Sequence, residues 1–426
     1  MKKLIVLLLV FSLLTANLVC LAQADSKPIT LRFWNSWTGS DGEVLEEVVA
    51  RFNEVNPYGI TIEMDRDSNM NSKLQVAYAS NTAPPLTLIN TGSIQDLVYQ
   101  EAIVPIDDIW EKTTLDKNDF VAAILEECSY NDHLYSIPMQ VNTRFLFWNK
   151  SLLERAGYDP DTPPQTWEEL KEMSAAITAL DDSIYGGGCP YDFHAGLVLM
   201  IKDYGGDIME AVGEGDYKCV INSPESMEAI KLWKSMIDNG SAPPLSSSDY
   251  GTMFKAGTLG FIMNGAFFST GLSDFVDFGV SVLPAGPVAR YSDMSVGGFA
   301  ITKCATEEEK EACYKFLDYW ANCTDTAWEE KAEIPARRWA LDCGFPPHLY
   351  SVRNDPEVQT TEPIATMSGY ADYVTPLFPK GFLMHQFIRS DCIQPMFEEI
   401  AYGADPQDAL ERYAAKMDTW KDQMIQ

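Results

Sequence analysis

Apolar and polar residues alternate along the chain with two different periods, which predicts strands and helices in turn. Positions 29–33 alternate between apolar and polar side chains, as a half-buried strand does. Apolar residues then recur at helical intervals over 44–52, and Ser40 and Glu43 just ahead of them have the spacing of a capping box. The same patterns predict a strand at 60–64, a helix at 73–79 and a strand at 86–89.

This order of elements predicts a parallel sheet whose connections are right-handed crossovers. A second region repeats the pattern, with strands expected at 145–148, 259–263 and 280–283 and helices expected to begin at Thr166, Ser223 and Thr306. The sequence contains no repeat of solenoid period, and no low-complexity tract separates the two regions. We therefore expect two lobes in direct contact.

The N-terminus has the pattern of a secretory signal peptide. Two lysines precede an apolar run over 4–14, and Ala22 and Ala24 supply small residues at a cleavage site. The mature chain is expected to begin at Asp25 and to be periplasmic or extracellular. Cys20 has no small residue directly before it, which favours a freely soluble product over one anchored by lipid at this cysteine. No later segment has the roughly 20 consecutive apolar residues of a membrane span.

Composition narrows the possible partners. Cleavage would leave about 400 of the 426 residues, enough for two or three domains. The formal net charge is -31, and such a surface repels phosphate backbones and anionic lipid, so no nucleic-acid partner is expected. Eight of the nine cysteines would remain, in a compartment where disulfides persist, and their pairing stays open. A local bridge is expected among four that cluster: Cys304, Cys313, Cys323 and Cys343.

Motifs for catalysis, metals and cofactors are missing. The segment 65–69 begins like a calcium loop, but Met70 and Val76 stand where a glycine and a bidentate acid are needed. The glycines at 186–188 are not followed by the residues of a phosphate loop, and no G-x-S-x-G is present. The histidines form no zinc-binding pattern and are expected to be structural: His133, His194, His348 and His385. A carboxylate pair for glycoside hydrolysis stays an alternative among 62 acidic residues.

Aromatic and short polar side chains gather instead at the expected loops. Trp37 lies beside Asn35 and Asp41 after the first strand, and Asn90 and Thr91 follow the third. Loops at the carboxyl ends of parallel strands are where open α/β sheets place ligands. Sugars need flat rings to stack on and amides or carboxylates to bind their hydroxyls. These loops therefore suit a carbohydrate.

Motifs in a characteristic order cover nearly the whole mature chain. They are LRFWNSWTG at 31–39, ASNTAP at 79–84, YSIP at 135–138, FWNK at 147–150, AG at 156–157, PQTWEEL at 164–170, FKAG at 254–257, MNGAF at 263–267 and GGFAI at 297–301. In this order and spacing the chain resembles the bacterial extracellular solute-binding proteins of carbohydrate ABC transporters, the group that includes maltose-binding protein. The proline at position 85 departs from the family, whose members commonly have aspartate there.

The resemblance implies an α/β fold of two lobes, each a mostly parallel sheet flanked by helices, joined by a hinge of several segments. The chain would cross near Val141, return near Tyr291 and cross again near Glu333. The implied divisions are a signal peptide at 1–24, a first lobe at 25–141 and 291–332, and a second lobe at 142–290 and 333–426.

The resemblance also implies ligand contacts. Asn142 falls where the hinge offers a polar side chain, and Phe267 stands where many members have a stacking tryptophan. Gly297 and Gly298 are similar to a turn that lets the backbone approach the ligand closely. The full implied set is Asn35, Trp37, Thr38, Asp41, Asn90, Thr91, Asn142, Tyr191, Asn264, Phe267, Gly297, Gly298 and Arg337.

The implied function is capture of a mono- or oligosaccharide in the cleft between the lobes and delivery to the permease subunits of an ABC transporter in the membrane. The protein would be a monomer, would use no cofactor and would not be an enzyme. Three alternatives stay open: a secreted glycoside hydrolase, a binder of polyamine or metal cation suggested by the acidic charge, and a binder of sugar phosphate suggested by Arg337.

Overall fold

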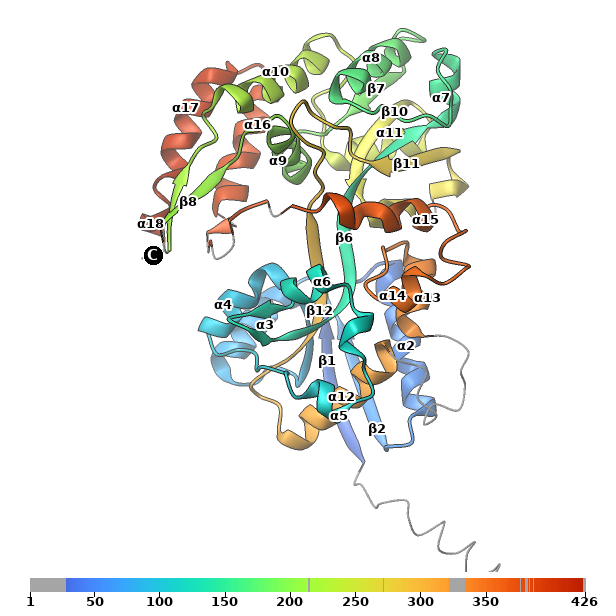
Figure 1. Cartoon of the computed structure of the whole chain (residues 1–426), viewed down its shortest axis with the longest axis vertical. Helices are drawn as coiled ribbons and strands as arrows, with labels where there is room; N and C mark the ends of the chain where they lie inside the picture. The colour runs from blue at the N-terminus through green and yellow to red at the C-terminus, as the bar shows by residue number, and fades with distance from the viewer. Residues whose placement is uncertain are drawn as a thin grey trace, which may run out of the picture.

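The computed structural model describes residues 28–213, 215–270, 272–321, 334–375, 377–379, 382, 384, 385 and 387–423. The expected signal peptide, Cys20, Cys323 and Glu333 lie outside these residues. The chain forms two α/β halves, one above the other in Figure 1, and two long strands run between them. The two-lobed fold expected from the sequence is confirmed.

The first half begins with the predicted alternation of strands and helices. Its elements in order are β1 (Ile29–Asn35), α2 (Ser40–Val55), β2 (Ile60–Arg66), α3 (Met70–Ser80), β3 (Leu86–Asn90), η1 (Thr91–Ser93), α4 (Ile94–Tyr99), α5 (Ile109–Lys112), η2 (Lys117–Asp119), α6 (Ala122–Glu127), β4 (Ser129–Tyr130) and β5 (His133–Leu134). β1 pairs in parallel with both β2 and β3, as the spacing predicted. The predicted capping box at Ser40 is wrong, because Gly39 caps α2 and no side chain takes part.

Two strands join the halves. They are β6 (Ser136–Asn149) and β12 (Met294–Ile301), which pair antiparallel with each other. β6 pairs with β12 up to Thr143, and from Arg144 onward it pairs with β10 (Leu259–Gly265) of the second half. The change of partner between Thr143 and Arg144 lies close to the predicted crossing at Val141.

The second half holds the remaining strands and most of the later helices. Its elements are α7 (Lys150–Arg155), α8 (Trp167–Thr178), β7 (Tyr185–Gly188), α9 (His194–Asp203), β8 (Met209–Gly213), β9 (Asp216–Cys219), α10 (Pro224–Asp238), α11 (Ser247–Lys255), β10, η3 (Ala266–Ser269), η4 (Leu272–Asp274) and β11 (Phe278–Val282). β10 pairs in parallel with β7 and antiparallel with β6. Thr166 caps α8 by accepting from the backbone N–H of Glu169, as predicted.

The C-terminal part of the chain contributes helices to both halves. Its elements are α12 (Glu307–Ala321), α13 (Pro335–Cys343), α14 (Tyr350–Arg353), α15 (Ile364–Met367), η5 (Ser368–Tyr373), η6 (Phe387–Ile393), α16 (Gln394–Ala401), α17 (Pro406–Met417) and α18 (Trp420–Gln423). α13 packs on α2 and α12, and Figure 1 shows α13 and α14 beside the lower half and α16 to α18 beside the upper. We therefore propose that the second lobe resumes after α14 rather than at residue 333.

The glycines at 186–188 allow close packing of α8 against β7. A Cβ on Gly186 would lie 2.0 Å from the backbone oxygen of Ser174, and a Cβ on Gly187 would lie 2.2 Å from the backbone oxygen of Phe261. The hydroxyl of Ser174 donates to the Gly187 carbonyl at 2.9 Å. Absence of side chains thus lets α8 lie directly on β7, which explains these glycines without a nucleotide.

The expected local disulfide is absent from the described residues. Three of the four clustered cysteines are free thiols: Cys304, Cys313 and Cys343. The fourth, Cys323, lies outside the described residues. Burial raises the pKa of Cys343 to about 12, so this thiol stays protonated. Among the described residues, none of the helices is both long and apolar enough to cross a membrane.

His348 is a structural histidine, and it should weaken the fold in acid. It is 2% exposed and its ring lies parallel to that of Trp320, with centroids 6.5 Å apart. Burial lowers the pKa of His348 to about 3, whereas an unfolded histidine titrates near about 6.5. As the pH falls from 6.5 towards 3, His348 becomes protonated in the unfolded chain but stays neutral in the folded chain. The free energy of unfolding therefore decreases over that range, by up to about 1.4 kcal/mol per pH unit.

We expect His348→Phe to reduce this slope by the contribution of His348, while His194 and His385, whose pKa values burial also lowers, keep theirs. Urea unfolding at pH 7, 6, 5 and 4 measures it, with His133→Gln as the control because His133 is exposed and bonded to Asp107. Equal slopes in the wild-type protein and His348→Phe would contradict the assignment.

Candidate functional site

Polar side chains line one face of the strands that join the halves. Asn90 of β3 lies opposite Gly297 of β12, which in turn lies opposite Gln140 of β6. Asn142 lies opposite Ser295, so the register places all these positions on one face of the sheet. The Asn90 amide donates to the Ser295 hydroxyl at 2.7 Å. We call this set the polar row: Asn90, Gln140, Asn142 and Ser295.

Two amide oxygens of the polar row have no partner. The Oδ1 of Asn142 and the Oε1 of Gln140 are buried and accept no hydrogen bond from the described residues. A buried acceptor without a donor costs free energy, and native structures keep few of them. Hydroxyl groups of a ligand could supply the missing donors.

Phe267 lies beside the polar row. A Cβ built on Gly265 would lie 2.5 Å from the Phe267 ring and 2.7 Å from the Asn142 Oδ1, so both side chains cover this glycine. Phe267 is 50% exposed, which is unusual for a large apolar side chain. The structure therefore brings Asn142 and Phe267 together, although they are far apart in sequence.

The loop after β1 presents Trp37 at the carboxyl edge of the sheet. Its ring stacks on Trp339 of α13, with centroids 5.6 Å apart. Asn35 is only 1% exposed, and its Oδ1 accepts from the Trp37 N–H at 2.9 Å. Asn35 thus shapes the loop instead of facing outward. Thr38 of this loop is exposed. Asp41 follows in the first turn of α2, where its charge acts on the nearby Cys343.

Three of the implied residues make contacts other than those of the polar row. Thr91 is buried in η1. Tyr191 contacts Tyr402 in the second half, with ring centroids 5.8 Å apart. Asn264 lies opposite Phe145 and is 8% exposed; because side chains alternate along a strand, it occupies the other face of β10 from Gly265.

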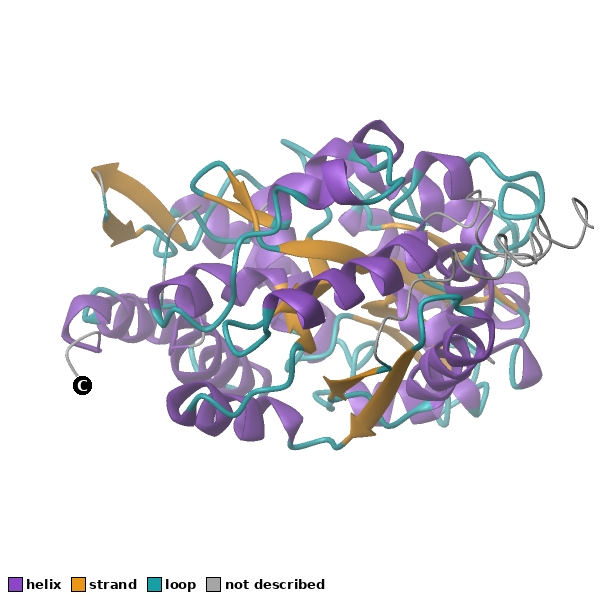
Figure 2. Cartoon of the chain, turned by 90° about the horizontal axis from the view of Figure 1, so that it is seen from below, coloured by secondary structure: helices purple, strands orange, loops and turns teal. Residues whose placement is uncertain are grey.

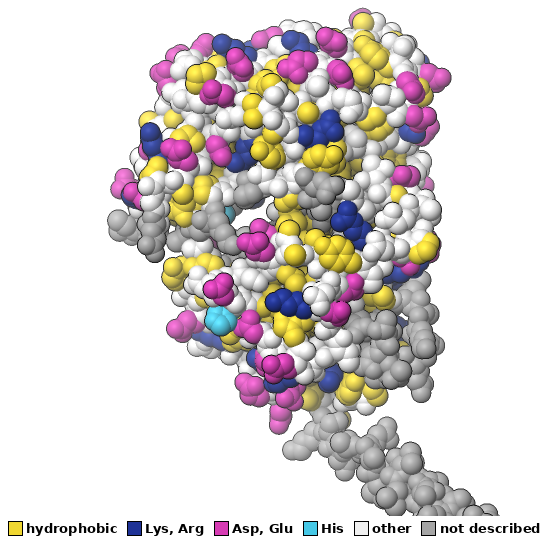
Figure 3. All heavy atoms as spheres, in the orientation of Figure 1, with side chains coloured by type: hydrophobic (Ala, Val, Ile, Leu, Met, Phe, Trp, Pro, Cys, Tyr) yellow, Lys and Arg dark blue, Asp and Glu magenta, His cyan; other side chains and the backbone are white. Residues whose placement is uncertain are grey.

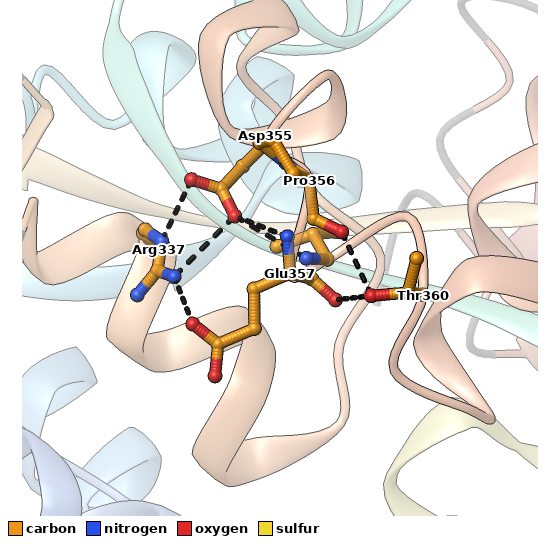
Figure 4. A network of polar contacts seen from close by, with 6 residues as sticks. Arg337, Asp355, Pro356, Glu357 and Thr360 are labelled. Carbon is orange, nitrogen blue, oxygen red and sulfur yellow. Dashed lines mark hydrogen bonds and ion pairs between the residues drawn. The ribbon is translucent and has the colours of Figure 1, made fainter.

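Arg337 is engaged by its own chain. Its Nε bonds to Asp355 at 3.0 Å, and its Nη2 bonds to Asp355 and Glu357 (Figure 4). The side chain of Arg337 is 18% exposed. The two carboxylates already occupy the fork that a ligand phosphate would need, so Arg337 carries no support for a sugar phosphate.

Gly297 and Gly298 lie within β12, not in a turn. The pairing with β6 shifts register between them, and a Cβ on Gly298 would lie 2.8 Å from the Ser136 hydroxyl. A Cβ on Gly297 would lie 3.0 Å from the Gln140 side chain. These glycines bring β12 close to β6, which corrects the turn expected from the resemblance.

Sequence reasoning missed the hinge residues Gln140, Arg144, Asp293 and Ser295. Arg144 follows Asn142 by two positions and forms an ion pair with Asp293, Nη2 to Oδ2 3.3 Å. The available signal was the recurrence of long polar side chains at the alternate positions 140, 142 and 144 of β6, although Thr143 between them is also polar.

Two recesses lie elsewhere on the molecule. Cavities of about 370 and 560 Å³ flank α15 and share Thr366, and neither is lined by a residue of the polar row. Figure 3 shows a hollowed waist between the two halves, with acidic side chains scattered over the outer surface of both. Within the described ranges, no three His, Cys, Asp or Glu residues are grouped as a metal site.

The sequence matches the family described as bacterial extracellular solute-binding protein over residues 47–366. This chain belongs to that family, whose members are the solute-binding components of ABC importers. It is similar to the sn-glycerol-3-phosphate-binding periplasmic protein UgpB of Escherichia coli, at 26% identity over 360 residues that cover 78% of this chain and 79% of UgpB.

Solved structures share the fold. UgpB from Mycobacterium tuberculosis in complex with glycerophosphocholine has a TM-score of 0.77 and 19% identity, covering 94% of this chain and 100% of that one. The GacH receptor of Streptomyces glaucescens, described in complex with acarbose, has a TM-score of 0.78 and 18% identity, covering 93% and 99%. These likenesses confirm the two-lobed fold.

Proposed function

We propose that this protein captures a mono- or oligosaccharide, or a derivative of one, between its two halves and presents it to the permease subunits of an ABC importer. The observation that carries the proposal is the pair of unpartnered amide oxygens on Gln140 and Asn142, on the strands that join the halves. Amide groups suit hydroxyls, and Phe267 offers a ring face beside them.

Binding would favour the closed arrangement because only that arrangement contacts the ligand from both halves. Moving a population from mostly open to mostly closed needs about 5 kcal/mol of differential affinity. Ring contacts at about 0.5 to 1.5 kcal/mol each and several hydrogen bonds at about 1 kcal/mol each reach that sum. We propose that the protein acts as a monomer and releases the solute chemically unchanged.

A thermal-shift panel tests the proposal. The panel contains mono- and oligosaccharides, phosphorylated polyols, amino acids and polyamines; the phosphorylated polyols are included because UgpB relatives are named for such a ligand. A ligand that binds only the folded protein raises the melting temperature. We expect carbohydrates or their derivatives to do so. A shift caused only by amino acids or polyamines, or shortened oligosaccharides after incubation, would overturn the proposal.

A further inference from the structure

Arg144 extends the polar row at the point where the halves meet. It lies opposite Gly265 and two positions beyond Asn142, so it shares their face of the sheet. Its side chain is 14% exposed and pairs with the buried Asp293. Its Nε is buried and donates no hydrogen bond to the described residues, and the guanidinium lies 5.5 Å from the Phe193 ring centroid. Arg144 therefore keeps unused donor capacity at this site.

A second arginine, on another element, is near enough for its charge to act on that of Arg144. Arg389 of η6 is solvent-exposed and forms no ion pair within the described residues. Surrounding protein and the positive charge of Arg144 both lower the pKa of Arg389. The two guanidinium groups thus lie within range of mutual repulsion, one from the joining strand and one from the C-terminal part of the second half.

Two neutral histidines border the pair. Burial, Arg389 and Arg144 together lower the pKa of His194 to about 4. Burial and Arg389 also lower the pKa of His385, whose Nε2 is buried without a hydrogen-bond partner among the described residues. Asp293 is the one carboxylate in an ion pair with these groups, so the described cluster holds more positive than negative charge.

This balance is unusual for the chain. Acidic residues outnumber basic ones by 62 to 31, so carboxylates are abundant, yet among the described residues Asp293 is the one ion-pair partner of these two arginines. Like charges held close together destabilise a site until an anion binds between them. Arginine offers a planar fork of donors that matches phosphate and carboxylate oxygens.

We infer that the cluster of Arg144 and Arg389 binds a negatively charged group on the ligand, a phosphate or a carboxylate carried by a sugar or polyol. The inference rests on the proposed function and names its substrate class. The amide oxygens of the polar row would accept from the ligand hydroxyls, while the two arginines bind its charged end.

Matched ligand pairs test the inference on the purified mature protein. The pairs are glucose with glucose 6-phosphate, glucose with glucuronate, and glycerol with glycerol 3-phosphate; inorganic phosphate is titrated alone. We expect the charged member of one pair to bind at least about tenfold more tightly than its neutral partner, with affinity that falls as salt rises. The phosphate and carboxylate arms distinguish the two sources of charge.

Arg389→Gln is the decisive variant because Arg389 is exposed and holds no ion pair in the described fold. This substitution should weaken binding of the charged ligand about 10- to 100-fold and leave the affinity for neutral ligands unchanged. Arg412→Gln, which removes another exposed arginine, on α17 and paired with Glu399, is the control and should have no effect. Arg144→Gln with Asp293→Asn removes the buried pair together, so it tests Arg144 without leaving a lone buried charge.

The outcomes separate the two proposals. Neutral sugars that bind as tightly as charged ones, or an Arg389→Gln variant that binds charged ligands normally, would overturn the anion site and leave sugar capture standing. Equal weakening of charged and neutral ligands would also overturn it. If no ligand of the matched pairs binds, charged or neutral, both the anion site and the proposed sugar capture are overturned.

Discussion

Trp37→Ala is expected to weaken ligand binding about 10- to 100-fold while the protein stays folded. At the carboxyl edge of the first-half sheet, the Trp37 backbone N–H donates to the Asn35 side chain and the Trp37 ring stacks on that of Trp339. A ring fixed in this way offers a rigid surface to a sugar at little cost in conformational entropy. Titration calorimetry with a ligand from the thermal-shift panel measures the loss, and circular dichroism checks the fold.

Phe275→Ala is the matched control, because Phe275 is another exposed ring, at 61%, in the second half. It should bind the ligand as the wild-type protein does. An affinity of Trp37→Ala equal to that of Phe275→Ala would remove Trp37 from the site. The comparison separates loss of a ligand contact from a general effect of deleting an aromatic side chain.

Asp293→Ala is expected to lower the free energy of unfolding by about 3 to 5 kcal/mol. Asp293 is 3% exposed and is the ion-pair partner of Arg144, so its removal leaves a buried positive charge uncompensated. Urea unfolding measures the change. A second substitution, Arg144→Leu, should recover part of the loss because it removes the stranded charge.

Asp216→Ala is the control for this pair. Asp216 pairs with Lys421 at the surface, where both side chains are about half exposed, and such pairs contribute about 1 kcal/mol or less. Equal losses for Asp293→Ala and Asp216→Ala would show that the hinge pair is not buried as described. A double variant no more stable than Asp293→Ala would contradict the role given to Arg144.

The fold could be predicted from the sequence because local signals agreed with it. Alternation over 29–33 and helical spacing over 44–52 correspond to β1 and α2, and the Thr166 cap begins α8. The cap of α2 was less predictable: Gly39 and Ser40 both suit the position, and backbone geometry decides between them. The contact of α13 with α2, on which we base the proposed later boundary of the second lobe, has no local signal in the sequence.

The site was only partly predictable. Trp37 and Asn90 follow predicted strands, so the edge they share could be inferred from topology. The pairing of Asn142 with Ser295 depends on the register of two strands about 150 positions apart, which a single sequence does not reveal. The ion pairs of Arg337 were hidden for the same reason, since its partners Asp355 and Glu357 lie after the next helix, α14, and only the fold brings them together.

Closure of the two halves over the solute is the central claim, and a distance measured across the waist tests it. Spin labels placed at Val76 on α3 and Val212 on β8 would report on it, because both positions are exposed and these elements lie on the same side of the molecule in Figure 1, one in each half. Saturating the protein with a carbohydrate ligand from the panel should shorten the mean distance between the labels and narrow its distribution, as measured by pulsed electron paramagnetic resonance. An identical distance distribution with and without bound ligand would contradict the account.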